Sequence, residues 1–580
     1  MRNHLTNLAL IVGVSFCGLL EAQDSRLSSD LRDAVSSHRD AVRGWQRTLD
    51  ASEVSAAEEI DVIVQFNDSA EDAGLPRLRG PMKRRLASGN TAVFRINPEQ
   101  IEALSRDARV RYITPDRTVE GTLEHANPTV FADIAFNYGW DGANIGVAVL
   151  DSGVLKIDDL KDNQCSNDRV VYRESFVPND SNVDDKYGHG THVATIIGGN
   201  GKCAEKDGRT KTFRGIAPGV KIIGLRVLNQ DGVGSDSAVI AAIDRAIALK
   251  SRFNIRVMNL SLGRRIMESY TLDPLCQAVE RAWKAGIVVV VSAGNNGRLV
   301  ATQGYGTIGS PANDPYVITV GSMKDAGTPN RADDTIATYS SKGPTLLDHV
   351  VKPDLVAPGN AIIAGLAAST TLLRSNYATT AVSTSYYLSA SSGTSQYYMR
   401  LSGTSMAAPM VSGAVAAMLQ KFPSLTPNQV KARLMKTATK SFPPMSVATV
   451  NGVSYTSHYD AFTVGAGYLN VWAALNNTDL ISVPSTSPLS PKVAYNTKTR
   501  HVTLTPDSLV WGDSLVWGDS LVWGDSLVWG DSLVWGDSLV WGDRKADGFS
   551  LVWGDSLVWG GSLVWGDTIT TRSVLTNDER

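Results

Sequence analysis

Three short motifs in this sequence carry residue types that together perform nucleophilic catalysis. Asp151 follows the apolar run 145–150, His189 lies among glycines, and Ser405 precedes an apolar stretch. A serine hydroxyl is a weak nucleophile at neutral pH. It needs a base within hydrogen-bond reach, and the base needs a carboxylate that fixes its tautomer and stabilises its charged form. Asp151, His189 and Ser405 supply all three groups.

The tetrahedral intermediate of such a reaction carries a negative oxygen, which requires hydrogen-bond donors. Asn295 lies in the stretch Ser-Ala-Gly-Asn-Asn-Gly, directly after an apolar run. Its side-chain amide can supply one donor, and the backbone N–H of Ser405, at a predicted helix start, can supply a second. Each motif alone is typical of a turn or a helix cap. The four together predict an acyl-transfer site.

The segments around these motifs alternate between strand-like and helix-like patterns. Runs of β-branched residues predict strands that are buried on both faces, and such strands form parallel sheets covered by helices. Strands are predicted at 145–150, 221–228, 256–262 and 287–291, and helices at 235–250, 272–285, 411–422 and 426–437. The fold class is therefore α/β, with a mainly parallel sheet flanked by helices. The carboxyl ends of its strands form one edge, where sites are expected.

As a set, the motifs resemble those of the subtilisin-like serine peptidases, the subtilase family. The matching stretches are 148–153, 188–194, 292–297 and 403–409. The order Asp, His, Ser along the chain is also that of subtilisin. The resemblance spans roughly residues 126–476 and implies a serine endopeptidase that cuts proteins or peptides through an acyl-enzyme. It also assigns the base to His189, whereas the residues alone leave His192 open.

The resemblance further implies where substrate binds. Ser261, Leu262 and Gly263 would line the cleft and pair with the substrate backbone by strand addition. A second stretch would form one wall of the pocket for the residue before the scissile bond: Ser292, Ala293 and Gly294. These three residues are small and uncharged, so that wall of the pocket carries no charge.

The segment ahead of the catalytic domain (126–482) has two expected parts. Residues 1–22 have a basic start and a short apolar run, which is typical of a secretory signal peptide and less so of an uncleaved membrane anchor. Residues 58–120 predict a small α+β unit, with strands at 61–66, 91–96 and 110–113 and a helix opening at 97–100. This unit resembles the inhibitory propeptide of subtilases, which implies a self-processed precursor cut between residues 115 and 127.

Cysteine content and charge limit the cofactors and partners. Four cysteines are present, and removal of residues 1–22 leaves Cys165, Cys203 and Cys276. Cys165 and Cys203 lie in polar stretches on either side of the His189 motif and are the preferred disulfide pair. The net charge of −3 gives no reason to expect nucleic acid. The chemistry requires no cofactor. Structural Ca²⁺ suits an exported enzyme, but no carboxylate spacing identifies a metal site.

The rest of the chain departs from the family pattern. Residues 360–402 are expected to form a surface excursion beside the site, and 483–506 a Pro/Ser-rich linker. The unit Ser-Leu-Val-Trp-Gly then occurs nine times within 507–567 and holds nine of the 13 tryptophans. Residues 568–580 follow the repeats. The repeats fit short strands joined by tight turns or a six-residue solenoid rung, and either a binding role or a passive extension is compatible with them.

Two functions are therefore compared. In the first, the protein is a secreted serine endopeptidase that matures itself. In the second, it is a surface or scaffold protein whose repeats self-associate or bind a surface, and whose protease serves only self-maturation. The complete set of Asp151, His189, Asn295 and Ser405 favours the first.

Overall fold

The computed structural model describes residues 26–27, 31, 35, 59–67, 82–85, 91–115, 121–122, 125–204, 208–389, 392–480, 487–488, 490–496, 501–505 and 568–570. The expected signal peptide (1–22) and the repeat region (507–567) lie outside these residues. The chain divides into two compact units, Met1–Val119 and Glu120–Arg580. Among the described residues, no helix has the length and apolar character needed to cross a bilayer.

The first unit is an antiparallel sheet with one helix against it. Its strands are β1 (Ile60–Phe66), β2 (Met82–Arg85), β3 (Thr91–Ile96) and β4 (Val110–Pro115), in the order β2-β3-β1-β4. Helix α3 (Pro98–Ser105) begins with a capping box in which Asn97 and Gln100 cap each other. Ile101 and Leu104 of this helix share a core with Val62 and Val64 of β1. The α+β organisation agrees with the sequence pattern, and β2 is an additional strand.

The second unit is built around an eight-stranded sheet with the order β14-β13-β12-β11-β6-β9-β7, in which β15 pairs with β13. Its strands are β6 (Gly146–Asp151), β7 (Val170–Ser175), β9 (Lys221–Arg226), β11 (Ile255–Leu260), β12 (Val288–Ser292), β13 (Ile318–Lys324), β14 (Thr335–Ile336) and β15 (Leu355–Pro358). Every pairing is parallel except that of β13 with β14. The four sequence-predicted strands are β6, β9, β11 and β12.

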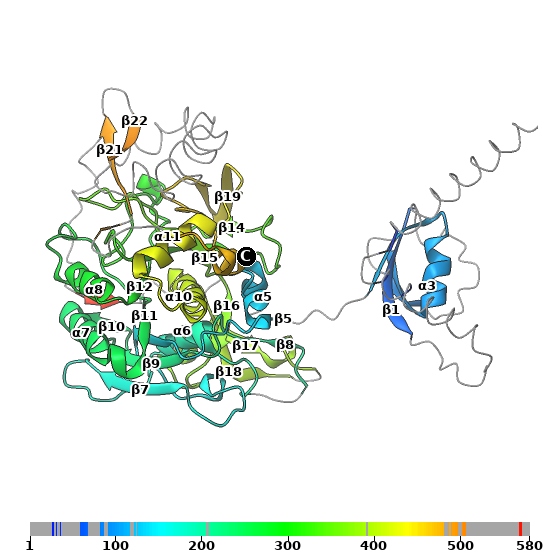
Figure 1. The fold of residues 1–580 in the computed structure, drawn as a ribbon, viewed down its shortest axis with the longest axis horizontal. Coiled ribbons are helices and arrows are strands. Elements are labelled where there is room, and N and C mark those ends of the chain that lie inside the picture. Colours follow the sequence, from blue (N-terminus) through cyan, green and yellow to red (C-terminus); the bar gives the residue numbers. More distant parts are fainter. Residues whose placement is uncertain are drawn as a thin grey trace, which may run out of the picture. The chain divides into compact units, whose positions relative to one another are not determined.

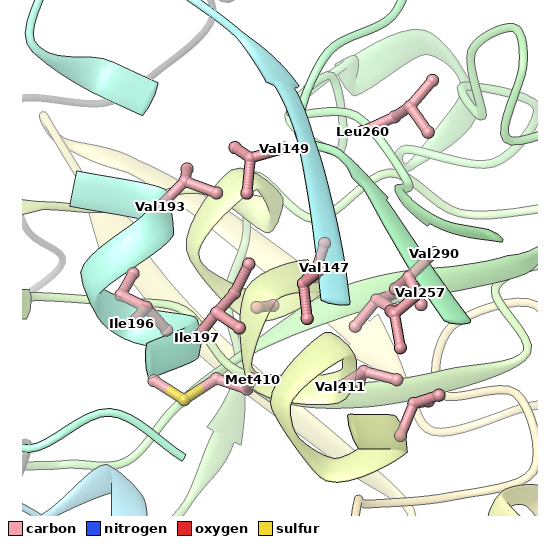
Figure 2. Packing of buried hydrophobic residues seen from close by; sticks show 14 of the residues in the cluster. Val147, Val149, Val193, Ile196, Ile197, Val257, Leu260, Val290, Met410 and Val411 are labelled. Atoms are coloured by element: carbon pink, nitrogen blue, oxygen red, sulfur yellow. The ribbon is translucent and has the colours of Figure 1, made fainter. Parts of the chain in front are cut away.

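Helices cover both faces of this sheet (Figure 1). The helices are α4 (Ala126–Thr129), α5 (Ala132–Asn137), α6 (His189–Gly198), α7 (Asp236–Phe253), α8 (Pro274–Lys284), α9 (Leu372–Asn376), α10 (Thr404–Lys421), α11 (Pro427–Thr437) and α12 (Val471–Asn476). Helices α7 and α8 pack against each other and against the sheet, and so do α6 and α10. Figure 2 shows the core around α6 and α10, with Val147, Val149, Val193, Ile196, Ile197, Val257, Leu260, Val290, Met410 and Val411. This core fixes the two helices that begin at the site.

Helix α10 begins earlier than the sequence pattern predicts. The apolar pattern predicts a helix over 411–422, but the helix begins at Thr404 and contains Pro409. A proline inside a helix lacks an N–H and cannot donate to the carbonyl four residues earlier, which here is that of Ser405. The hydroxyl of Ser261 donates to that carbonyl at 2.9 Å instead. An external donor therefore supports the first turn of α10.

Residues 360–402 do not form the surface excursion that the sequence suggested. They contain β16 (Ile362–Gly365), β17 (Ala381–Ser383) and β18 (Thr394–Leu401), which form an antiparallel sheet in the order β16-β18-β17. Tyr387 and Tyr398 are fully buried and make edge-on contacts with Phe213. A composition rich in Ser, Thr and Tyr does not predict that these two rings are buried. This segment is therefore part of the core beside α6.

The expected linker 483–506 and the segment after the repeats also differ from prediction. Strands β21 (Lys492–Asn496) and β22 (His501–Thr505) form an antiparallel hairpin, and the buried Ser490 donates to Asp354. The catalytic unit therefore extends to at least residue 505. Strand β23 (Thr568–Thr570) pairs with β10 (Val233–Ser235) of the same unit. Two further pairs are β5 (Gly121–Thr122) with β8 (Lys211–Thr212), and β19 (Met445–Val450) with β20 (Val453–His458).

The cysteines occupy two environments. Cys165 and Cys203 form a disulfide with a Cα–Cα distance of 5.5 Å, which is the pair that the sequence favours. Cys276 is a free thiol buried in α8, and its burial raises its pKa well above the ordinary value. The disulfide ties the loop before β7 to the loop after α6, and Cys276 serves as a small core residue.

Candidate active site

Asp151 is the last residue of β6, a strand buried along its whole length. Its side chain is fully buried. One oxygen, Oδ1, accepts a hydrogen bond from the backbone N–H of Ser152 at 2.7 Å and lies 2.7 Å from Nδ1 of His189. The strand end therefore holds the carboxylate in one orientation, with the imidazole as its partner.

His189 is the first residue of α6 and is also fully buried. The residue before it, Gly188, has φ of 98°, which is a conformation that favours glycine. Gly190 lies against the strand end, because a Cβ at this position would come within 2.1 Å of the Gly153 carbonyl oxygen and 3.0 Å of the Asp151 Cβ. The glycines on both sides of His189 thus allow the helix to start in contact with Asp151.

Asp185 joins the Asp151 and His189 motifs and was not identified from the sequence. Its buried carboxylate accepts hydrogen bonds from the Ser152 hydroxyl at 2.8 Å, from the Gly188 N–H at 2.7 Å and from the Thr191 N–H at 2.8 Å. Burial raises the pKa of Asp185, and the bonds from Thr191 and Gly188 act in the opposite direction. The only sequence signal was an acidic pair just ahead of the glycines around His189. Asp185 therefore contacts both motifs and is a candidate positioning residue.

The second histidine of the motif, His192, has a structural role. Its Nε2 lies 3.2 Å from the carbonyl oxygens of both Ile362 and Met399. Complete burial lowers the pKa of His192 to about 3, with the nearby His189 acting in the same direction. A neutral imidazole that donates to buried carbonyls is not available as a general base. His189 therefore remains the candidate base, a choice that the residues alone left open.

Ser405 is the second residue of α10 and is buried, with 4% of its surface exposed. Its hydroxyl donates a long hydrogen bond of 3.3 Å to the Ser261 carbonyl. Nε2 of His189 is buried and has no hydrogen-bond partner among the described residues. When Nδ1 of the neutral ring donates its proton to Asp151, Nε2 is the unprotonated nitrogen, the one that can accept a proton. Catalytic hydrogen bonds are often loose in unliganded sites and tighten with substrate.

Asn295 follows β12 and is oriented by Thr404, the residue ahead of Ser405. Its Oδ1 accepts hydrogen bonds from the Thr404 N–H at 2.9 Å and from the Thr404 hydroxyl at 3.0 Å. With Oδ1 fixed in this way, Nδ2 faces Gly403, where an added Cβ would be 3.2 Å away. The Asn295 amide and the first turn of α10 therefore lie side by side, as an oxyanion site requires.

The predicted cleft residues lie at the ends of two neighbouring strands, β11 and β12. After β11, Ser261 and Leu262 are buried and Gly263 is half-buried; after β12, Ser292 and Ala293 are buried and Gly294 is half-buried. Ser261 contacts Ser405 directly, and the Gly294 N–H donates to the Thr404 hydroxyl oxygen at 3.1 Å. All six residues therefore belong to the carboxyl edge of the sheet that carries Asp151.

Comparison with known proteins identifies the family. A family model described as "Subtilase family" matches residues 142–458, a range that contains Asp151, His189, Asn295 and Ser405. The chain belongs to the subtilase family. It is a subtilisin-like serine endopeptidase with the α/β fold of that family.

Individual subtilases are similar over most of their own length. Serine protease AprX of Bacillus subtilis (strain 168) is 33% identical over 396 residues, which cover 66% of this chain and 83% of that protein. Subtilisin DY of Bacillus licheniformis is 33% identical over 354 residues, which cover 61% of this chain and 98% of that protein. A solved structure of a cold-adapted subtilisin-like serine proteinase is 27% identical, covers 57% of this chain and 90% of its own, and superposes with a TM-score of 0.38.

Proposed function

We propose that Asp151, His189 and Ser405 are the catalytic triad of this endopeptidase. The observation that carries the proposal is the fully buried contact of 2.7 Å between Asp151 and His189, which leaves Nε2 of His189 as a buried acceptor without a partner among the described residues. An unpaired buried nitrogen costs free energy, and a nucleophile's proton gives it a partner during the reaction.

The chemistry follows from these roles. Ser405 Oγ attacks the carbonyl carbon of the scissile bond, and its proton moves to His189 Nε2 while Asp151 stabilises the imidazolium. Asn295 Nδ2 and the Ser405 N–H donate to the oxyanion. The C–N bond then breaks as His189 returns the proton to the leaving amine. Water, deprotonated by His189, hydrolyses the Ser405 ester and restores the hydroxyl. No cofactor takes part in these steps.

The substrates are proteins or peptides bound in extended form. Their backbone pairs with Ser261, Leu262 and Gly263, and the side chain before the scissile bond lies against Ser292, Ala293 and Gly294. The residue types along this wall are small and uncharged. No cluster of three or more Asp, Glu, His or Cys side chains suited to a metal occurs among the described residues. We therefore assign no residue to the binding of Ca²⁺.

The first unit is proposed to be an inhibitory propeptide, and the mature enzyme to be extracellular. Support comes from the separate core of this unit, from the signal-like residues 1–22, and from a disulfide, which persists in oxidising compartments. The chain would cut itself between residues 115 and 127. Free propeptide would then compete with substrate until it is degraded.

The test is the intact mass, over time, of the purified precursor and of its Ser405→Ala variant, together with casein hydrolysis. We expect only the wild type to lose the segment ahead of about residue 126 and to degrade casein. Equal casein hydrolysis by Ser405→Ala would overturn the triad assignment. If both proteins stay intact while the wild type hydrolyses casein, the triad stands and self-processing is lost.

A scaffold function is the second candidate, and the nine repeat units within 507–567 favour it. Deletion of 507–567 separates the two functions. A scaffold role predicts loss of self-association and surface retention without change in casein turnover. Unchanged retention and association after the deletion would exclude it.

A further inference from the structure

Strand β23 supplies an unexpected neighbour for β10. Thr568–Thr570 pairs antiparallel with Val233–Ser235, with Gly234 opposite Ile569; β23 is the red strand in Figure 1. The other edge of β10 is already occupied, because Leu228 bridges to Gly234 and the Asn229 N–H donates to the Val233 carbonyl at 2.8 Å. A segment that follows the repeats therefore completes the outer edge of β10.

The turn before β10 starts at the catalytic carboxylate. The backbone N–H groups of Val227 and Leu228 both donate to the Asp151 carbonyl, at 2.8 and 3.2 Å. Gly234 then approaches this turn so closely that a Cβ would lie 2.5 Å from the Val227 oxygen. β10 is thus held against the strand end that carries Asp151.

The residue after β10 is tied to the predicted substrate-pairing segment. Arg264, next to Gly263, donates to the Asp236 carboxylate, next to Ser235, at 2.9 Å. β10 therefore lies at the same edge of the sheet as Ser261 to Gly263.

We propose that the segment Thr568–Thr570 of the same chain occupies the free edge of β10 and thereby limits the access of extended substrates to the active site. The proposal rests on the function proposed above. An unpaired strand edge binds extended peptides through main-chain hydrogen bonds and tolerates many sequences. The Thr-Ile-Thr sequence of the segment is β-branched and uncharged, as a strand partner should be. Tethering to the same chain raises its effective concentration.

The docked segment competes with extended substrates for β10. A protein substrate that needs this edge must displace it, whereas a small ester that occupies only the pocket beside Ser405 need not. If the segment is docked about 90% of the time, the apparent KM for extended substrates is raised about tenfold and kcat is unchanged.

The first experiment compares the full-length protein with its Ile569→Pro variant. Proline at this position removes a backbone N–H and fixes φ, which weakens pairing with Gly234. Val574→Pro, outside the paired segment, is the matched control. For an extended peptide substrate we expect KM to fall about tenfold in Ile569→Pro alone, with kcat and the hydrolysis of a small ester unchanged. Equal KM values in all three proteins, each verified by intact mass to retain residue 580, would overturn the proposal.

A second measurement does not depend on activity. In the Ser405→Ala background, we expect amide hydrogen exchange within 230–240 to be faster with Ile569→Pro than with Val574→Pro. Equal exchange would overturn docking, even if the protein were an active protease. If exchange is faster with Ile569→Pro but the wild-type protein hydrolyses no substrate, docking is supported and the triad assignment is lost. Protection that disappears on dilution would assign the occupant to a second copy and overturn the intrachain proposal.

Discussion

The hydroxyl of Ser261 donates a hydrogen bond to the carbonyl oxygen of Ser405 at 2.9 Å. This carbonyl has no intrahelical donor because Pro409 lies four residues later. Asn259 donates to the Ser261 hydroxyl at 3.0 Å, and Ser412 donates to Asn259 at 2.8 Å. A chain of hydrogen bonds thus joins the end of β11 to α10 at two points, Ser405 and Ser412.

Ser261→Ala should lower both stability and turnover. The substitution leaves the buried Ser405 carbonyl and the Asn259 amide without this partner, at a cost of about 1–3 kcal/mol in the free energy of unfolding. Denaturant titration and steady-state kinetics measure the two effects. Ser261→Thr keeps the hydroxyl and should retain more turnover than Ser261→Ala. Equal turnover in wild type and Ser261→Ala would mean that the bond does not position Ser405.

Asp185→Asn should reduce kcat more than it changes KM. The new amide would place its own N–H groups against the Ser152 hydroxyl and the Thr191 N–H, which now donate hydrogen bonds to Asp185. The start of α6 would therefore shift relative to Asp151. A displacement of about 1 Å can cost up to about 100-fold in rate. Asp184→Asn is the matched control, since Asp184 is half exposed and pairs with Arg173. A similar kcat in both variants would reduce Asp185 to a structural role.

Asn295→Ala should lower kcat and leave KM nearly unchanged, because the amide would act on the oxyanion and not on the bound substrate. Loss of one such donor in subtilisin is known to cost roughly 100- to 1,000-fold, and we carry that magnitude over as an expectation. Thr404→Val, which removes one of the two bonds to Oδ1, should give a smaller loss of the same kind. A change confined to KM would contradict the oxyanion role.

His192 should make the protein less stable in acid. Its folded pKa of about 3 lies below the ordinary 6.5, so the unfolded chain binds the extra proton between these values. Stability from this group is therefore complete above pH 6.5 and is lost as the pH falls towards 3. In the Ser405→Ala background, the loss between pH 7 and 4.5 should be about 2–3 kcal/mol larger with His192 than with His192→Gln. Parallel pH profiles would contradict this account.

Replacement of Cys165 and Cys203 by serine should destabilise the catalytic unit. The disulfide closes a loop with a sequence separation of 38, for which the chain-entropy model gives about 4 kcal/mol. Thermal unfolding of the inactive Ser405→Ala protein measures the loss. Addition of reductant should lower the unfolding temperature of the parent protein towards that of the double variant. The unfolding temperature of the double variant should not change. Cys276→Ala controls for the remaining thiol.

The sequence was most informative where chemistry and local geometry coincide. Asp151, His189, Asn295 and Ser405 each lie at a strand end or a helix start, and short motifs reveal such positions. Asp185 was missed because its role depends on contacts with two other segments. The core position of residues 360–402 was missed for a related reason, because Tyr387 and Tyr398 are buried by tertiary contacts with Phe213. The pairing of Thr568–Thr570 with β10 joins residues too distant in sequence for any local pattern.

The complete burial of Asp151 and His189 has a consequence for enzymes that work outside the cell. Dissolved salt screens exposed charges beyond a Debye length of about 8–10 Å, but it screens buried pairs much less. Since neither side chain is exposed, the attraction that holds the imidazole in its reactive tautomer should be nearly the same in dilute and in saline surroundings. Any sensitivity of this protease to ionic strength should therefore arise when substrate approaches the surface, and not in the bond-breaking steps.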